Sequence, residues 1–167
     1  MQKLKIRPAE MKDASQIGAV GYSAWLNGIG KHVGREVHER INSELYASFA
    51  RASFLQITVA EYDGLVVGFA GTESGENYIS DLWVSPDFEG FGIGSTLVST
   101  MEEIVVNRGY DTVEIEVLTA NTRALQLYQH LGYGTVWQGT REDPFLCVNL
   151  HKTVLRKTVG EQPSTLS

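Results

Sequence analysis

The chain has 167 residues, of which 43% are hydrophobic and 20% charged. This length predicts a single domain, and the composition excludes an intrinsically disordered or collagen-like chain. Its 14 basic and 20 acidic side chains give a net charge of -6, which lacks the basic footprint of a nucleic-acid-binding protein and attracts cationic amines.

The first half of the chain predicts two helices and four strands. Apolar residues recur at helical spacing over residues 13–26, which Gly28 and Gly30 end, and more weakly over residues 33–49. The period then shortens to that of a strand, and the pair Asp63 and Gly64 predicts a hairpin. The predicted strands occupy residues 4–6, 54–61, 65–72 and 78–84.

The second half predicts two further helices and three strands. The helices occupy residues 92–108 and 121–131, each followed by a glycine at the C-cap position, and the strands occupy residues 112–118, 133–138 and 146–154. A meander followed by a strand-helix-strand unit implies a mixed sheet with one right-handed parallel crossover. We therefore expect an α/β domain over residues 1–156, with about seven mostly antiparallel strands, four helices and a frayed tail at residues 157–167.

The single cysteine and the N-terminal sequence indicate the cellular compartment in which we expect the protein. Cys147 stands in an apolar stretch and is predicted to be a small core residue, and one cysteine cannot form an internal disulfide. The N-terminus lacks the apolar segment of a signal peptide, and no apolar run approaches the roughly 18 residues that span a bilayer. We expect a soluble cytoplasmic protein with no membrane partner.

The most informative segment is a glycine-rich loop. Gly90, Gly92 and Gly94 lie between a predicted strand and the clearest predicted helix. Glycine permits a positive φ, and the first N–H groups of a helix form an electropositive site for phosphate. The dinucleotide motif G-x-G-x-x-G fails, because its third glycine falls on Ser95 or Leu97. A dinucleotide site remains the second alternative, and the missing Gly-Lys-Ser/Thr excludes a P-loop.

Two segments carry a family resemblance. Residues 84–94 resemble the acetyl-CoA loop of the GNAT superfamily of N-acetyltransferases, whose pattern is Gln/Arg-x-x-Gly-x-Gly/Ala. Residues 121–133 resemble its segment N-x-x-A-x-x-L-Y-x-x-x-G-F/Y, and the order of elements agrees from Leu4 to Val154. The resemblance implies a GNAT-like fold and transfer of acetyl from acetyl-CoA to a primary amine in a ternary complex.

The resemblance also implies which residues bind acetyl-CoA. One departure is Glu89, which stands where the family pattern has Gln or Arg. A carboxylate beside a pyrophosphate is unfavourable unless it points to solvent or pairs with a cation, so we expect weaker cofactor binding. The implied cofactor-binding residues are Leu82, Trp83, Val84, Glu89, Gly90, Phe91, Gly92, Ile93, Gly94, Ser95 and Asn121.

The catalytic roles follow by the same resemblance. Tyr128 is expected to protonate the leaving thiolate, and it shares one side of its helix with Asn121. Glu76 is the expected general base, with Asp81, Glu73 or a chain of waters as competitors.

The acceptor and the assembly stay open. The acceptor is either a small amine or a protein N-terminus, a homodimer is compatible with the sequence, and the four histidines show no metal-ligand spacing. A non-catalytic CoA-binding sensor or interaction domain is the alternative to an enzyme.

Overall fold

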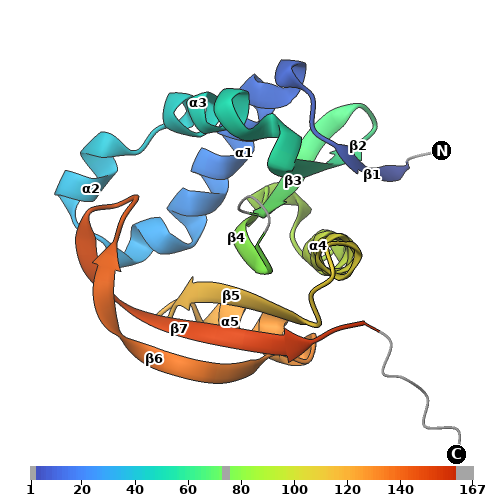
Figure 1. Ribbon diagram of the computed structural model, residues 1–167. Coiled ribbons are helices and arrows are strands. Elements are labelled where there is room, and N and C mark those ends of the chain that lie inside the picture. The colour runs from blue at the N-terminus through green and yellow to red at the C-terminus, as the bar shows by residue number, and fades with distance from the viewer. Residues whose placement is uncertain (1–2, 73–75, 161–167) are drawn as a thin grey trace, which may run out of the picture.

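The computed structural model describes residues 3–72 and 76–160. Within these residues one mixed sheet has the strand order β1-β2-β3-β4-β5-β7-β6, and five α-helices accompany it (Figure 1). The predicted mixed α/β architecture is confirmed. The strands are β1 Leu4–Pro8, β2 Ile57–Tyr62, β3 Leu65–Thr72, β4 Tyr78–Val84, β5 Thr112–Leu118, β6 Gly134–Asp143 and β7 Val148–Thr158. The helices are α1 Ala14–Asn27, α2 Arg35–Arg40, α3 Ser43–Ser53, α4 Ile93–Asn107 and α5 Thr122–His130.

The prediction of one helix over residues 33–49 was wrong, because two helices occupy this stretch. Ile41 is extended and buried, and Asn42 begins α3 as its N-cap, accepting a hydrogen bond from the Leu45 N–H at 2.9 Å. An asparagine side chain that satisfies a free helical N–H favours a new helix start over continuation of the old one. The described chain therefore has five α-helices where the sequence predicted four.

Several strand boundaries also differ from the sequence prediction. Phe54–Gln56 forms a 3₁₀ turn before β2 begins. At the other end, β6 and β7 pair along a long hairpin, and Lys157 and Thr158 pair with Val113 and Thr112 of β5. The last strand therefore extends beyond residue 154, and the first two residues of the expected tail, Lys157 and Thr158, are part of the sheet.

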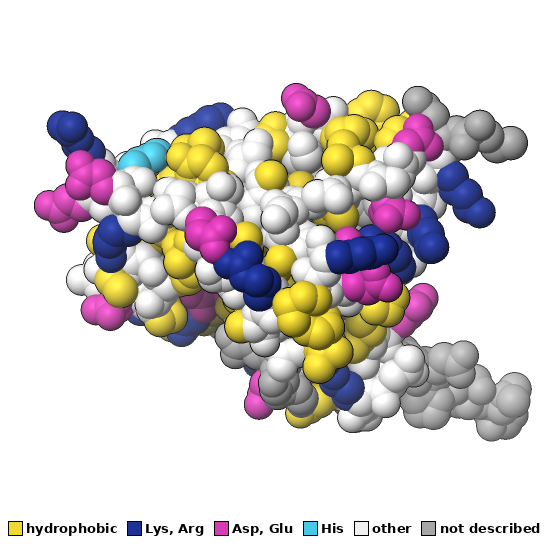
Figure 2. Space-filling model, turned by 90° about the horizontal axis from the view of Figure 1, so that it is seen from above, with side chains coloured by type: hydrophobic (Ala, Val, Ile, Leu, Met, Phe, Trp, Pro, Cys, Tyr) yellow, Lys and Arg dark blue, Asp and Glu magenta, His cyan; other side chains and the backbone are white. Residues whose placement is uncertain are grey.

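Two hydrophobic cores cover the two faces of the sheet. Ile17 and Trp25 of α1 pack with Val59 and Phe69 on one face, together with α2 and α3. Leu97 of α4 and the helix α5 pack on the opposite face. Figure 2 shows basic, acidic and hydrophobic side chains interspersed on the face seen from above, without a large patch of one charge.

The sheet is interrupted between β4 and β5, the two strands of its parallel pair. Their register holds only Tyr78 opposite Glu114 and Ile79 opposite Ile115. Just before this pair, the Asn77 amide donates to the Thr112 carbonyl at 2.9 Å and ties the two strands together. Beyond Ile79 the strands have no shared ladder, so they separate toward their C-terminal ends. This separation creates the opening in which the candidate site lies.

Candidate functional site

Two cavities meet in the opening between β4 and β5. The first, which we call the inner cavity, has a volume of about 580 Å³ and reaches from α1 and α3 to the turn between β6 and β7. The second, the loop groove, has a volume of about 620 Å³ and lies between α1, the β4–α4 loop and the start of α5. The two cavities share five of their lining residues, Leu82, Trp83, Asn121, Ala124 and Tyr128.

The loop groove has the geometry of an anion site. Gly90 and Gly92 have φ values of +84° and +78°, and Gly92 is the N-cap of α4. This left-handed backbone favours glycine and presents the first N–H groups of α4, which have no helical partner. An added Cβ at Gly94 would lie 3.5 Å from Leu127, which is an ordinary van der Waals contact, so the backbone conformation that needs glycine is at Gly90 and Gly92. The positive helix end and Lys31 on the opposite wall suit a phosphate-bearing ligand.

The departure at Glu89 is compensated by the fold. The Glu89 carboxylate pairs with the Arg123 guanidinium at 2.5 Å and accepts a hydrogen bond from the Asn27 amide at 3.3 Å. Arg123 belongs to α5 and also lines the groove. Sequence reasoning missed Arg123, although it stands inside the segment at residues 121–133 that carries the resemblance. The structure thus supplies the cation that a carboxylate at this position requires.

The free edge of β4 presents backbone groups to both cavities. The Ser85 N–H donates to the Val67 carbonyl of β3 at 2.8 Å. Because the polar groups of successive strand residues point to opposite edges, those of Leu82 and Val84 turn away from β3. They face the gap that β5 leaves beyond Ile79.

The inner cavity has an aromatic wall and a short turn above it. The Tyr46 ring lies edge-on to Trp83 and beside Phe145, with ring centroids 5.9 Å apart in each case. The Arg40 guanidinium donates to the Leu146 carbonyl at 2.6 Å and ties the β6–β7 turn to α2. Figure 1 shows the end of this hairpin beside α2. These contacts confine the cavity at the side of the turn.

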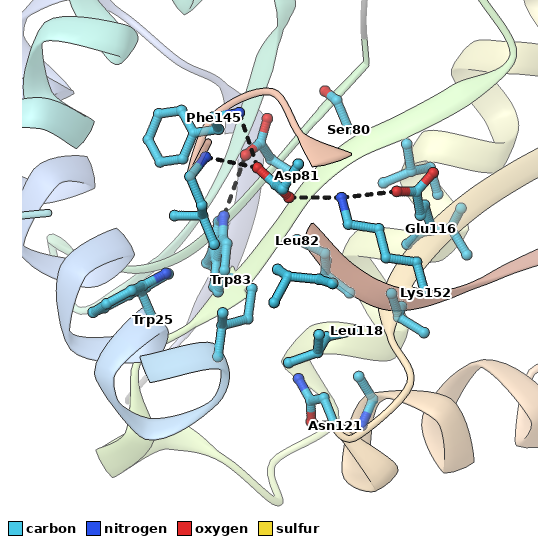
Figure 3. Close-up of a pocket in the computed structure, with 18 of the residues that line it drawn as sticks. Trp25, Ser80, Asp81, Leu82, Trp83, Glu116, Leu118, Asn121, Phe145 and Lys152 are labelled. Carbon is cyan, nitrogen blue, oxygen red and sulfur yellow. Dashed lines mark hydrogen bonds and ion pairs between the residues drawn. The ribbon is translucent and has the colours of Figure 1, made fainter. Parts of the chain in front are cut away.

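One end of the inner cavity carries a network of charges. The Lys152 ammonium pairs with Glu116 at 2.9 Å (Figure 3) and with Asp143 at 2.6 Å. Arg141 also pairs with Glu116. Burial alone would raise the pKa of the Asp143 carboxyl, but hydrogen bonds from Lys152 and from the Leu146 N–H hold that pKa below its usual range. Asp143 therefore stays ionised and fixes both the ammonium and the turn.

Two residues predicted from the sequence lie where the cavities join. Tyr128 is buried, and burial raises the pKa of its hydroxyl, which therefore stays protonated at neutral pH. Asn121 is the N-cap of α5, its side-chain oxygen accepting from the Ala124 N–H at 3.3 Å. The predicted pairing of these two residues at one cleft is therefore present in the geometry.

The candidate bases differ in their position relative to β4: Glu76 precedes the strand and Asp81 lies in its middle. Glu76 is exposed, lines neither cavity and precedes Leu82 by six residues, which is roughly 20 Å of extended chain. Asp81 lines the inner cavity, and its carboxylate accepts a hydrogen bond from the Trp83 indole N–H at 3.3 Å. Glu73 lies outside the described residues. The geometry therefore brings Asp81, and not Glu76, to the cavity.

The other predicted residues divide between the groove and the surface. Phe91 is 73% exposed and packs beside Phe88, so its side chain lies outside the groove. Cys147 is exposed, and the prediction of a core cysteine was wrong, because this residue occupies the β6–β7 turn with a φ of +57°. The remaining cofactor-binding residues predicted from the sequence all line the loop groove: Leu82, Trp83, Val84, Glu89, Gly90, Gly92, Ile93, Gly94, Ser95 and Asn121.

Across residues 3–72 and 76–160, no three histidine, cysteine or acidic side chains gather in a group that could hold a metal ion. In the same described stretches, no helix has the length and apolar character needed to cross a membrane.

Known proteins resemble this chain in sequence and in fold. The thialysine N-epsilon-acetyltransferase of Mus musculus is 35% identical over 103 residues, which cover 58% of this chain and 59% of that protein. The Bos taurus protein of the same name is 29% identical over 99 residues, covering 59% of this chain and 56% of that protein. The matched part of the chain thus spans less than two thirds of either relative.

Solved structures share the fold over nearly the whole chain. A GCN5-related N-acetyltransferase from Rhodopseudomonas palustris has a TM-score of 0.73 and 24% identity, covering 93% of this chain and 95% of that one. The PaiA N-acetyltransferase from Thermoplasma acidophilum, solved with coenzyme A, has a TM-score of 0.75 and 16% identity, covering 94% and 99%. The model of the acetyltransferase (GNAT) family matches residues 22–133, more than half of the sequence. The chain therefore belongs to the GNAT family of acetyltransferases.

Proposed function

We propose that the protein is an N-acetyltransferase that moves an acetyl group from acetyl-CoA to a small primary amine. The observation that carries this proposal is the meeting of two cavities at the open edge of β4, with Tyr128 lining both. A transferase with two substrates needs two sites that touch at the reacting atoms. The loop groove is assigned to the cofactor and the inner cavity to the amine.

The loop groove suits coenzyme A by its own chemistry. The α4 N-terminus and its positive-φ glycines offer backbone donors to a pyrophosphate, and Lys31 and Arg123 add positive charge. The outward-facing N–H and C=O groups of Leu82 and Val84 can pair with an extended, amide-bearing chain as a further strand would. Acetyl-CoA supplies the acetyl group as a thioester, and a fold relative was solved with coenzyme A.

The inner cavity suits a small cationic amine. Its lining includes four acidic side chains, Asp81, Glu116, Glu142 and Asp143, against the two basic side chains Arg141 and Lys152. The surplus of negative charge favours an ammonium. The named relatives are thialysine N-epsilon-acetyltransferases, which supports a small amine as the acceptor over a protein N-terminus.

The residues at the junction have distinct proposed roles. Asp81 accepts hydrogen bonds from the ammonium of the acceptor and takes its proton before attack. The outward-facing N–H groups of Leu82 and Val84 stabilise the charge that develops on the carbonyl oxygen. A C–N bond then forms, the C–S bond breaks, and Tyr128 gives its phenolic proton to the leaving sulfur, while the extra proton on the new amide nitrogen passes to the Tyr128 phenolate. Its high pKa keeps that proton available.

A thiol-release assay with acetyl-CoA and a panel of amines and peptides tests the proposal. We expect turnover with small diamines and basic amino acids, and a loss of about 10²-fold or more in kcat when Asp81 is changed to Asn. Glu76→Gln is the matched control, because its carboxylate lies outside both cavities. Binding of coenzyme A without turnover of any acceptor would favour the alternative of a CoA-binding sensor.

A further inference from the structure

Trp25 has a donor without a partner at the wall of the inner cavity. The residue is 1% exposed and lines that cavity. Among the described residues, its indole nitrogen is the one buried side-chain N or O atom that has no hydrogen-bond partner. Buried polar groups are nearly always paired, so an unpaired N–H beside a cavity calls for an explanation.

The packing around Trp25 fixes the direction of this donor. The Cζ3 corner of the indole faces Gly30, where an added Cβ would lie 3.1 Å away, and His38 contacts the ring edge-on at 4.9 Å. Tyr22 stacks on the ring at 6.5 Å. Nε1 stands across the ring from Cζ3 and is therefore turned away from Gly30. Figure 3 shows this nitrogen on the side of the ring that faces Trp83 and the cavity.

The surroundings indicate which ligand could satisfy the donor. Trp25 lines the inner cavity but not the loop groove, whose wall on the same helix is made by Ala24 and Asn27. The partner therefore comes with the acceptor and not with the cofactor. An N–H donor requires an acceptor atom, and an ammonium has none. A plain alkylamine or diamine would leave the indole unpaired.

We propose that Trp25 determines acceptor specificity by donating its indole N–H to a carbonyl or carboxylate oxygen of the acceptor. The inference rests on the proposed function, since it assigns the inner cavity to the amine. It narrows the substrate to an amine that also carries an acyl group, such as a basic amino acid or its amide. The reacting amine meets the cofactor at Tyr128, while the oxygen is held at Trp25.

Two acceptors that differ in one group test the proposal. L-lysinamide and 1,5-diaminopentane share the same carbon chain and both amines, and only lysinamide has the carboxamide. We expect kcat/KM to favour lysinamide about 5- to 100-fold, the range expected for one buried hydrogen bond. In Trp25→Phe this ratio should fall to within about twofold of unity, because the ring remains but the donor is lost.

The ratio of the two kcat/KM values does not change when part of the protein fails to fold, because that would lower both rates together. Trp137→Phe is the matched control, because Trp137 is partly exposed on β6 and lines neither cavity. Its ratio should equal that of the parent. A parent enzyme without preference for lysinamide, or a Trp25→Phe variant that keeps the preference, would overturn the proposal.

A binding measurement separates this inference from the proposed activity. The chain has three tryptophans, so the indole N–H resonances are few, and Trp25→Phe assigns the one of interest. In the presence of coenzyme A, lysinamide should move the Trp25 resonance downfield and 1,5-diaminopentane should not. A resonance that moves equally with coenzyme A alone, or not at all with lysinamide, refutes the proposal. A specific shift without any turnover would support it while contradicting the acetyltransferase assignment.

Discussion

The ion pair between Glu89 and Arg123 makes a sharp prediction about cofactor affinity. Glu89 is 27% exposed by its side chain and lies at the mouth of the loop groove, with its charge balanced by Arg123 at 2.5 Å. Changing Arg123 to Gln removes the balance and leaves the carboxylate facing the pyrophosphate. Changing Glu89 to Gln removes the carboxylate and leaves the cation.

The size of the effect follows from the charges. One charge about 8 Å from two pyrophosphate charges, at an effective dielectric constant of about 40, is repelled by about 2 kcal/mol. Arg123→Gln should therefore weaken binding of coenzyme A about 30-fold. In the parent, the attraction of Arg123 for the same two phosphate charges offsets this repulsion, and Arg123→Gln removes that attraction. Glu89→Gln should tighten binding by only about 3-fold, because the Arg123 side chain released from Glu89 is 68% exposed and is screened by solvent.

Titration calorimetry of the parent, both single variants and the double variant measures this coupling. The double variant should bind coenzyme A within about 3-fold of the parent, because neither charge is left alone. Pantetheine, which lacks the phosphates, is the control ligand and should bind all four proteins alike. Parent-like affinity in Arg123→Gln, or an equal loss for pantetheine, would show that this charge balance does not govern the groove.

Three further variants test other parts of the structure. Tyr128→Phe should lower kcat by about 10²-fold or more with little change in the KM for acetyl-CoA, and an unchanged kcat would exclude the acid role. Gly92→Ala should cost about 1 kcal/mol of stability in urea unfolding, from its φ of +78° alone, because an added Cβ meets no atom within 4 Å. Hydrogen bonds from Arg7 lower the pKa of the buried Asp13 carboxyl, so this group stabilises the fold above its unfolded pKa of about 3.9 and loses that contribution as pH falls through the folded pKa. Asp13→Asn should therefore lower the free energy of unfolding by about 3 kcal/mol at pH 7, and this difference should shrink below about pH 4. A difference that stays constant with pH would refute this reasoning.

The parts of the site that could be predicted are those encoded by local sequence. The glycine loop and the start of α5 depend on residues a few positions apart, so positive-φ glycines and an asparagine cap are visible in the sequence. The inner cavity is different. Lys152 meets Asp143 across the β6–β7 hairpin, with a sequence separation of 9, but it meets Glu116 only through the pairing of β7 with β5, which is distant in sequence. No local sequence pattern predicts a contact between strands that are distant in sequence.

The same contrast explains the errors made from the sequence. Helical periodicity continued past Ile41, but the cap made by Asn42 outweighed it. Cys147 stood among apolar residues, yet its neighbour Leu146 took the buried place while Cys147 took the left-handed turn position. The sequence did contain a signal for Arg123, because it is the cation within the segment at residues 121–133 and Glu89 requires a cation as its partner.

The short parallel pairing of β4 and β5 has a consequence for how such a protein can change its acceptor. Under the proposed function, the contacts of the cofactor along β4 come from main-chain atoms that a neighbouring strand would otherwise cover. Main-chain groups are the same whatever side chains surround them. Substitutions that reshape the inner cavity can therefore alter which amine is accepted while the main-chain contacts of the cofactor stay the same, provided that Asn77 still joins β4 to β5 at the closed end of the gap.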